Sequence, residues 1–554
     1  MERLRSGRWI LLAVCGCGGT DGSDHAGPPL VASATAGSES GALTVGSGPI
    51  DPQPDPCVLG EGADTTAGGG EDSSDDGGFK FDVGGPDGNV GFGATCEDVA
   101  DQPSNLGCVF WAVDLPNDER GTPMSPPAAE QPFAVVVANV SALEDAHVQV
   151  FAGDGTEVLA SATVAPTETT VLDLGEASVP AMLSSTGIDA LRIESDVPIA
   201  AYQFNPAANT LEVYSNDASL LLPENALGAD YTATTADGIL LGMSASDPNP
   251  VNAGAFVAVV GTVDGTTVTI DATSALVGSL ADPIVVDRGE VATILSDAGT
   301  GGGGNLSGTR VHADHPIAVF AGNVATAIPA DIEVCCADHL EHQLLPATAW
   351  GTRYAVAPPP LPDGSGDATA LYRFVADDEG NELLYCPSRP AGAPASLGPG
   401  ETVAFETDEP FTVRSADPDR PLSITQFTLS NTVLGDSGLG DPAMTVVIPL
   451  GQHERRSLFV VPAGYAANWA TVVVPGEGEV RLDGEPIPPD DFAPLGIVGG
   501  VQHRYVHVAL PAGTHALEAE APAGVMVYGV DEAVGYAFAG GSGARILSLP
   551  PAAG

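Results

Sequence analysis

The chain has 554 residues, and 73 acidic side chains against 18 basic ones give it a formal net charge of −55. A chain this acidic repels phosphate groups, which excludes nucleic acid as a partner and anionic lipid as a docking surface. At about 150 residues per domain the length allows roughly three or four domains. We expect no resident cofactor, with calcium as the one candidate because acidic surfaces outside a cell attract cations.

The first residues have the features of an export signal. Three arginines precede a short apolar run, Trp9–Val14, which is too short to cross a bilayer. Cys17 follows the small residue Gly16, as the lipidated cysteine of a lipobox does, whereas Cys15 follows a bulky residue. We therefore predict a lipoprotein signal peptide over residues 1–17, and a protein held at the outer membrane or cell surface by a lipid on Cys17. An ordinary signal peptide with incidental cysteines is the alternative.

Residues 18–95 are dense in Gly, Ser, Asp, Thr and Pro. Such a composition cannot bury enough apolar surface to offset the entropy lost on ordering. The sequence therefore predicts a disordered acidic tether between the lipid anchor and the folded body.

Short apolar runs separated by turns begin after residue 95. Asp-Gly turns at Asp154-Gly155 and Asp264-Gly265 separate runs typical of antiparallel hairpins. The runs are Phe133–Val140, Val148–Ala152, Phe256–Val263 and Val268–Ala272. With 44% hydrophobic but only 5% aromatic residues, this pattern predicts an all-β protein.

An Asp and a Pro between two apolar runs recur along the chain. The aspartates and prolines are Asp196 with Pro198, Asp314 with Pro316, and Asp417 with Pro421, and a degenerate copy has Pro522. We expect the proline to fix a turn across which the flanking strands pair. A second signature, Leu-Leu-Pro followed by an aromatic residue, ends at Tyr231 and again at Tyr354. Each repeat of about 100–120 residues is the size of a β-sandwich.

The expected organisation is a lead-in segment followed by four tandem β-sandwich-like repeats. The lead-in covers residues 96–132, and the repeats cover 133–255, 256–370, 371–468 and 469–549. A β-propeller with two blades per repeat is the alternative. The segments that follow the Asp-x-Pro strands are expected to be exposed loops carrying binding residues. They are Gln203–Asn209, Gly322–Ile328 and Gln426–Asn431.

Several ordered motifs resemble one family. The motifs are the stretch 307–322, Asp338–Pro346, Trp350–Tyr354, and Gly440–Thr445. Together they are similar to the domain named for the N-terminal region of the IgG Fc-binding protein of mucus, which also occurs in bacterial surface proteins. Residues 104–117 resemble the lead-in of myxobacterial members. The resemblance extends over roughly residues 96–545 and implies a binding or structural module with no catalytic residues to carry over.

Six cysteines follow the signal region, and export permits disulfides. Cys96 and Cys108 are close in sequence and form a candidate pair. Cys57 has no obvious partner in the sequence. We expect a disulfide from Cys335 or Cys336, with Cys386 as its partner.

Two clusters invite a chemical interpretation. Residues 335–342 crowd thiols, imidazoles and carboxylates, but zinc sites draw on two separated ligand pairs, so we predict no metal site. Residues 435–438 (Gly-Asp-Ser-Gly) resemble the nucleophile loop of a serine protease, but no histidine stands in a matching context. We therefore predict a non-catalytic surface lipoprotein that binds an extracellular protein or glycan. A structural envelope component is the alternative, and a secreted hydrolase the distant one.

Overall fold

The computed structural model describes residues 57–58, 95–120, 127–175, 184–206, 215–241, 250–299, 303–330, 337–434 and 438–548. Strands dominate these residues, which confirms the all-β prediction. The two α-helices in them, α1 (Cys96–Ala100) and α2 (Asn431–Leu434), have five and four residues. The signal region with Cys17, almost all of the expected tether, and the Cys335-Cys336 pair lie outside the described residues. Within the described part, none of the helices has the length and apolar character needed to cross a membrane.

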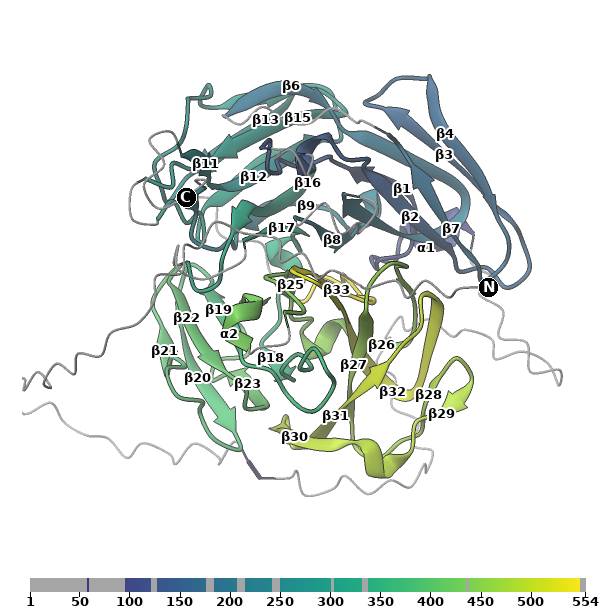
Figure 1. The fold of residues 1–554 in the computed structure, drawn as a ribbon, viewed down its shortest axis with the longest axis vertical. Helices are drawn as coiled ribbons and strands as arrows, with labels where there is room; N and C mark the ends of the chain where they lie inside the picture. Colours follow the sequence, from purple (N-terminus) through teal and green to yellow (C-terminus); the bar gives the residue numbers. More distant parts are fainter. Residues whose placement is uncertain are drawn as a thin grey trace, which may run out of the picture.

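The strands form four groups around a common centre, which we number as repeats 1 to 4 by the sheets that they form and not by the predicted boundaries. Repeats 1 and 2 lie in the upper half of Figure 1 and repeats 3 and 4 in the lower half. The described residues form curled, sandwich-like sheets, and no propeller is found among them.

In repeat 1 the strand order is β4-β3-β7-β2-β5, and β1 and β8 also pair with β7. The expected lead-in therefore contributes a strand, β1, to this sheet. The strands are β1 (Gly107–Ala112), β2 (Ala134–Asn139), β3 (Ala146–Ala152), β4 (Val158–Val164), β5 (Thr169–Asp173), β7 (Leu191–Asn205) and β8 (Asp217–Leu220).

In repeat 2 the order is β14-β13-β16-β12-β15-β6, and β9 and β17 also pair with β16. The strands are β6 (Ser185–Asp189), β9 (Gly228–Thr232), β12 (Ala255–Gly261), β13 (Thr266–Asp271), β14 (Ile284–Val286), β15 (Glu290–Leu295), β16 (Arg310–Thr326) and β17 (Asp338–Gln343). Two further strands, β10 (Ile239–Leu241) and β11 (Val251–Ala253), pair with each other.

Repeat 3 consists of two sheets, β18-β23-β20-β21 and β22-β19-β24-β25. Its strands are β18 (Arg353–Val356), β19 (Ala370–Ala376), β20 (Asn381–Cys386), β21 (Ser396–Leu397), β22 (Thr402–Thr407), β23 (Phe411–Ser415), β24 (Leu422–Thr428) and β25 (Met444–Val446).

In repeat 4 the order is β29-β28-β32-β27-β31-β30, and β26 and β33 also pair with β32. Its strands are β26 (Glu454–Val461), β27 (Ala467–Pro475), β28 (Val480–Leu482), β29 (Glu485–Pro486), β30 (Ala493–Val498), β31 (Val501–Ala509), β32 (Gly513–Asp531) and β33 (Val534–Ala539). The described residues also include short 3-10 turns: η1 (Ala128–Glu130), η2 (Glu224–Ala226), η3 (Ala347–Ala349), η4 (Leu450–Gln452) and η5 (Pro489–Asp491).

The Asp-x-Pro signature lies inside one long strand, not in a turn between two paired strands. In β7 the residues before Pro198 pair with β1 and β3, and those after it pair with β2 and β8. The expectation that the flanking strands pair with each other is therefore wrong. The proline interrupts the hydrogen bonding with β1 and β3, and beyond it β7 continues and pairs with β2 and β8. In repeat 3 a longer insert with two prolines, Asp417–Pro421, separates β23 from β24.

The aspartate of the signature stabilises this bend. Asp196 accepts a hydrogen bond at 2.8 Å from the backbone N–H of His147, on β3. Asp314 accepts the equivalent bond, also at 2.8 Å, from Thr267 on β13. These carboxylates are largely solvent-exposed, and each satisfies an N–H group that the bend removes from the ladder. The repeated signature is therefore a structural device.

The second signature joins neighbouring repeats. A glycine at the start of one connecting strand packs on the proline that precedes the next 3-10 turn. A Cβ atom added at these glycines would lie 2.3, 2.6 and 2.4 Å from the proline Cβ atom. The pairs are Gly107 with Pro223, Gly228 with Pro346, and Gly351 with Pro449. Only glycine allows this close an approach, which explains the recurrence of the motif.

Candidate functional site

The centre of the molecule is formed by four short strands, β8, β17, β25 and β33, which we call the return strands. Each pairs with the second half of the long strand of its own repeat, or with β24 in repeat 3. They also contact one another across repeats, and their labels gather at the middle of Figure 1. All six residues of β17, Asp-His-Leu-Glu-His-Gln, are buried. Polar residues therefore occupy the place where an apolar core is usual.

One carboxylate connects all four return strands. Asp217 on β8 accepts hydrogen bonds from the N–H of Ala218 at 2.9 Å and of Ala537, on β33, at 3.3 Å. Its second oxygen accepts bonds from Glu341 on β17 and Met444 on β25, both at 3.2 Å. Burial raises the pKa of this carboxyl, and the hydrogen bond from Ala218 opposes the rise. The side chain joins the four repeats at a single point.

Asp338, at the start of β17, has a similar role. It accepts bonds from the N–H of Asn216 at 2.6 Å and of His339 at 2.8 Å. A third bond, at 3.3 Å, comes from Gly535 in repeat 4. Burial raises its pKa, as does the nearby Asp217. Two acids of neighbouring repeats thus satisfy backbone donors that would otherwise be buried without partners.

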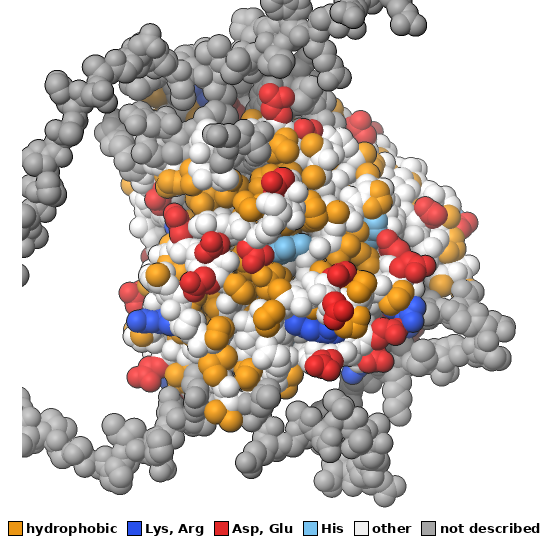
Figure 2. Space-filling view, turned by 60° about the horizontal axis from the view of Figure 1, so that its bottom comes forward, with side chains coloured by type: hydrophobic (Ala, Val, Ile, Leu, Met, Phe, Trp, Pro, Cys, Tyr) orange, Lys and Arg blue, Asp and Glu red, His pale blue; other side chains and the backbone are white. Residues whose placement is uncertain are grey.

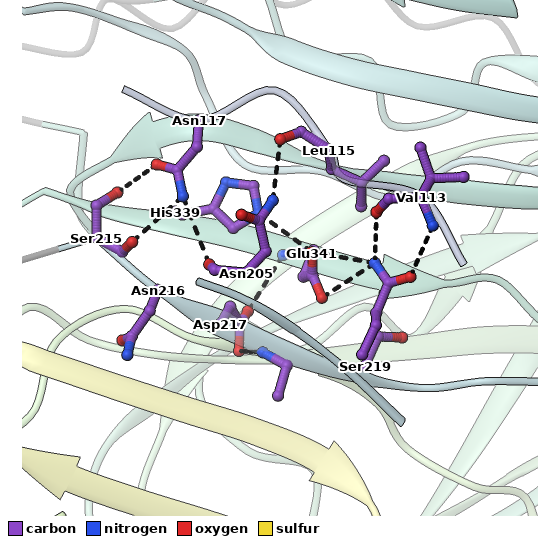
Figure 3. A network of polar contacts seen from close by, with 12 residues as sticks. Val113, Leu115, Asn117, Asn205, Ser215, Asn216, Asp217, Ser219, His339 and Glu341 are labelled. Carbon is purple, nitrogen blue, oxygen red and sulfur yellow. Dashed lines mark hydrogen bonds and ion pairs between the residues drawn. The ribbon is translucent and has the colours of Figure 1, made fainter. Parts of the chain in front are cut away.

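Glu341 is the third buried acid of the centre (Figure 3). Both of its oxygens lie 3.2 Å from Nε2 of Gln203, on β7, and one lies 3.4 Å from Nε2 of His339. Burial raises the pKa of Glu341 and lowers that of His339 to about 3. His339 also stacks on Phe256, with ring centroids 5.9 Å apart. The neutral imidazole is therefore held by packing and by polar contacts with Glu341 and with the backbone at Asn323 and Val324.

The segment after β1 is anchored in the same network. Gln203 bonds both the N–H and the carbonyl of Val113 at 3.1 Å, and Asn205 donates to the carbonyl of Leu115 at 2.9 Å. Asn117 accepts a bond from Ser215 at 2.7 Å. These contacts are among the dashed lines of Figure 3. Through these contacts the segment after β1 packs against the centre.

The buried acids of this centre make their contacts within the chain. The acids Asp217, Asp338 and Glu341 are fully buried and bonded by groups of the chain itself. In the described parts of the chain, no three His, Cys, Asp or Glu side chains are grouped so as to hold a metal ion. Residues 338–343 form the strand β17, so His339 and His342 stand on an extended backbone.

The segments predicted to be exposed binding loops are largely buried where they are described. Gln203, Asn205, Asn323, Gln426 and Ser430 are each at most 2% exposed. They hold the centre instead of facing a partner, because the second half of each long strand runs inward. That prediction was therefore wrong for the described residues.

The cysteines partly follow expectation. Cys96 and Cys108 form a disulfide, with Cα atoms 5.8 Å apart. Cys386 is bonded to Cys57, so the expectation that Cys335 or Cys336 pairs with Cys386 is wrong. A separation of 329 residues leaves no sequence signal for this bridge. It ties the N-terminal segment to repeat 3.

Open space occurs at another place, the seam between repeats 3 and 4. An inner hollow with a volume of about 20 Å³, room for little more than one water molecule, is lined by residues that include Ala355, Gln426, Val447 and Gly524. A second, apolar hollow of the same volume, about 20 Å³, is lined by residues that include Pro362, Thr369, Trp469 and Tyr536. Tyr528 lines both, and its hydroxyl donates to Oε1 of Gln426 across the seam. Sequence reasoning missed these hollows, because no motif marks the residues that line them.

The fold and its centre define an all-β protein of interlocked repeats whose buried polar residues serve assembly. A sequence model of the IgGFc binding protein family matches residues 217–529, more than half of the chain, so the chain belongs to this family. The human IgGFc-binding protein is 27% identical over 399 residues, which cover 70% of this chain and 7% of the human protein. The chain thus spans a small fraction of that relative's length.

Proposed function

We propose that this chain is a non-catalytic binding protein displayed on the cell surface, where it adheres to an extracellular protein or glycan. The observation that carries the proposal is that the buried carboxylate of Asp217 accepts hydrogen bonds from backbone N–H groups of all four return strands. Acids used in this way have no access to a substrate. Membership of a family named for binding agrees with this function.

The acidic charge of the surface limits which partners can bind. Acidic side chains are scattered among hydrophobic ones on the face shown in Figure 2, and basic side chains are few. A net charge of −55 disfavours polyanionic partners such as sulfated glycans. Neutral glycans and protein surfaces that are not acidic fit better.

Binding is tested with the purified full chain, immobilised through a C-terminal tag. The human IgG Fc fragment and an array of neutral and sulfated glycans are the probes. We expect saturable binding to Fc or to neutral glycans and none to sulfated ones. Absence of any saturable binding would instead favour a structural envelope component. Turnover of peptide, ester or glycoside substrates that is abolished by one side-chain change would overturn the proposal.

Display at the surface rests on the lipobox cysteine. Cys17→Ser is expected to block lipidation and release the protein into a soluble fraction, and Cys15→Ser is the matched control that should stay with membranes. Fractionation followed by immunoblotting measures both. Release of the Cys15→Ser variant alone would contradict the assignment of Cys17.

A further inference from the structure

The sheet of repeat 1 ends in β4, a strand with one unpaired edge. β4 pairs with β3 along one side and with none of the described strands along the other, and its label lies at the outer end of repeat 1 in Figure 1. We propose that this edge is an interface at which β4 pairs antiparallel with β4 of a second copy of the chain. The inference goes beyond the proposed function, because the partner is another copy and not Fc or a glycan.

The edge of β4 lacks the usual protection against pairing. Natural proteins protect edge strands with charges, with prolines or by keeping them short. β4 has seven residues, Val-Leu-Ala-Ser-Ala-Thr-Val, without a charge or a proline. The strands at the ends of the other described sheets are short or carry what β4 lacks. For example, β14 has three residues, β22 contains Glu406 and β30 contains Pro494.

One face of β4 already contributes to a core. Ala160 and Ala162 pack on the apolar core of repeats 1 and 2, yet both remain partly exposed at the end of the sheet. A bulge leaves Leu159 out of the pairing with β3, whereas Ala160–Val164 pair regularly. A strand added beside Ala160–Val164 would therefore continue the sheet, cover this face and pair with the backbone groups at the free edge.

Exposed apolar side chains stand at both ends of β4. Val158 and Leu159 are 42% and 49% exposed at its beginning, and Leu143 is 71% exposed. Leu143 lies near the end of the strand, because the amide of Asn139 bonds the carbonyls of both Glu144 and Val164. In an antiparallel pair the beginning of one strand lies beside the end of the other. A two-fold arrangement thus brings Leu159 of one copy towards Leu143 of the next.

Charge favours a second copy at this edge. The net charge of −55 makes two copies repel each other over most of their surface, but along β4 they can meet without placing like charges opposite one another. A second copy also supplies an ordered strand, with little conformational entropy to lose on pairing. A glycan has no row of N–H and C=O groups to pair with the edge.

The chain contains one competing segment. Residues 32–35, which lie outside the described residues, have the same sequence, Ala-Ser-Ala-Thr, as Ala160–Thr163. This segment could pair with the edge in place of a second copy. The experiment therefore includes the variant Ser33→Lys, which places a charge within the competing segment.

Sedimentation velocity of the full chain, made soluble by Cys17→Ser, tests the proposal from micromolar to millimolar concentration. We expect a reversible rise from the mass of one chain to that of two. Thr163→Lys places two ammonium groups close together across the new strand pair, so the dissociation constant should rise about tenfold or more. Thr269→Lys is the matched control, because this exposed threonine is on β13, which lies between β14 and β16 in its sheet. Both variants gain the same charge, so a change in net charge cannot account for a loss in Thr163→Lys alone.

Melting curves show whether each variant is folded, and Ser161→Lys replaces Thr163→Lys if the latter does not fold. A chain that stays monomeric up to millimolar concentration would overturn the proposal. So would a dimer that Thr163→Lys and Thr269→Lys leave equally stable, since it would use another surface. A monomer that dimerises only with Ser33→Lys would show that the competing segment covers the edge, and would also overturn it. These results are independent of Fc and glycan binding.

Discussion

The seam between repeats 1 and 2 and the seam between repeats 3 and 4 occupy similar places in the fold but are filled differently. The first is closed by a buried acid, Asp217, which accepts the backbone N–H of Glu341 on the facing return strand. The second contains two hollows, because small residues such as Ala355, Ala357 and Gly524 stand along it. The comparison indicates that one seam is closed by buried polar contacts while the other retains small hollows between its side chains.

The largest expected effect on stability is at the seam between repeats 1 and 2, which we call the packed seam. Asp217→Ala leaves four buried N–H groups without their acceptor, on Ala218, Glu341, Met444 and Ala537. At about 1–3 kcal/mol for each unsatisfied group, we expect a loss of about 4 kcal/mol or more, or failure to fold. Urea unfolding measures the change.

Asp271→Ala is the control for that experiment, since Asp271 is exposed on β13. It should change the free energy of unfolding by no more than about 0.5 kcal/mol. A stability loss at Asp217 no larger than at Asp271 would show that the carboxylate is not what holds the return strands together.

A methyl group added at the packed seam should lower the free energy of unfolding by nearly as much. In Gly322→Ala the new Cβ atom would lie 1.8 Å from the carbonyl oxygen of Leu340 and 2.9 Å from Cζ of Phe256. The β16–β17 pair must separate to admit it, and we expect a loss of about 3 kcal/mol. Gly366→Ala, in the loop beside the apolar hollow, meets no atom within 4 Å and should be neutral. Similar melting temperatures for the two variants would remove the distinction between the seams.

The packed seam should also make the protein sensitive to acid. Burial lowers the pKa of His342 from 6.5 to about 4. Between these values the unfolded chain takes up a proton that the folded chain does not, so stability is lost as the pH falls below 6.5. At pH 5 the loss is about 2 kcal/mol for this one side chain.

His342→Leu removes that contribution. Relative to wild type, the variant should gain about 2 kcal/mol when urea unfolding is measured at pH 5 and compared with pH 8. The measurement at pH 8 is its own control for the change in packing. Parallel pH profiles for the two proteins would mean that His342 is solvated in the folded state.

Local chemistry made much of the fold predictable. Alternating runs and Asp-Gly turns placed strands near β2, β3, β12 and β13, and repeated motifs indicated repeated units. The meaning of the Asp-x-Pro signature was not predictable, because a proline that ends a strand and one that bends a long strand have the same sequence pattern. The two kinds of proline are distinguished by which strands pair on either side of them. Those partners lie far away in sequence, as β2 does from the half of β7 that follows Pro198.

The centre was even less accessible from sequence. Asp338, His339 and Glu341 attracted attention as a chemical cluster, and they do lie in the centre, but Asp217 has an unremarkable context. Its importance comes from three strands that are 124, 227 and 320 residues away along the chain. Likewise the hollow lined by Trp469 exists only because two repeats meet there, and no motif marks it in the sequence.

The smallest effect compares the same substitution at both seams. Val447→Ile adds one methylene where the side chain lines the inner hollow, so the added group can occupy empty space. We expect a change between zero and a gain of about 1 kcal/mol, the value of one buried methylene. Val319→Ile adds the same group to β16, where the side chain is fully buried in a packed core. Overpacking there should cost about 1–3 kcal/mol. Thermal and urea unfolding of the two variants measure the difference, and equal losses would mean that the inner hollow between repeats 3 and 4 is closed in solution.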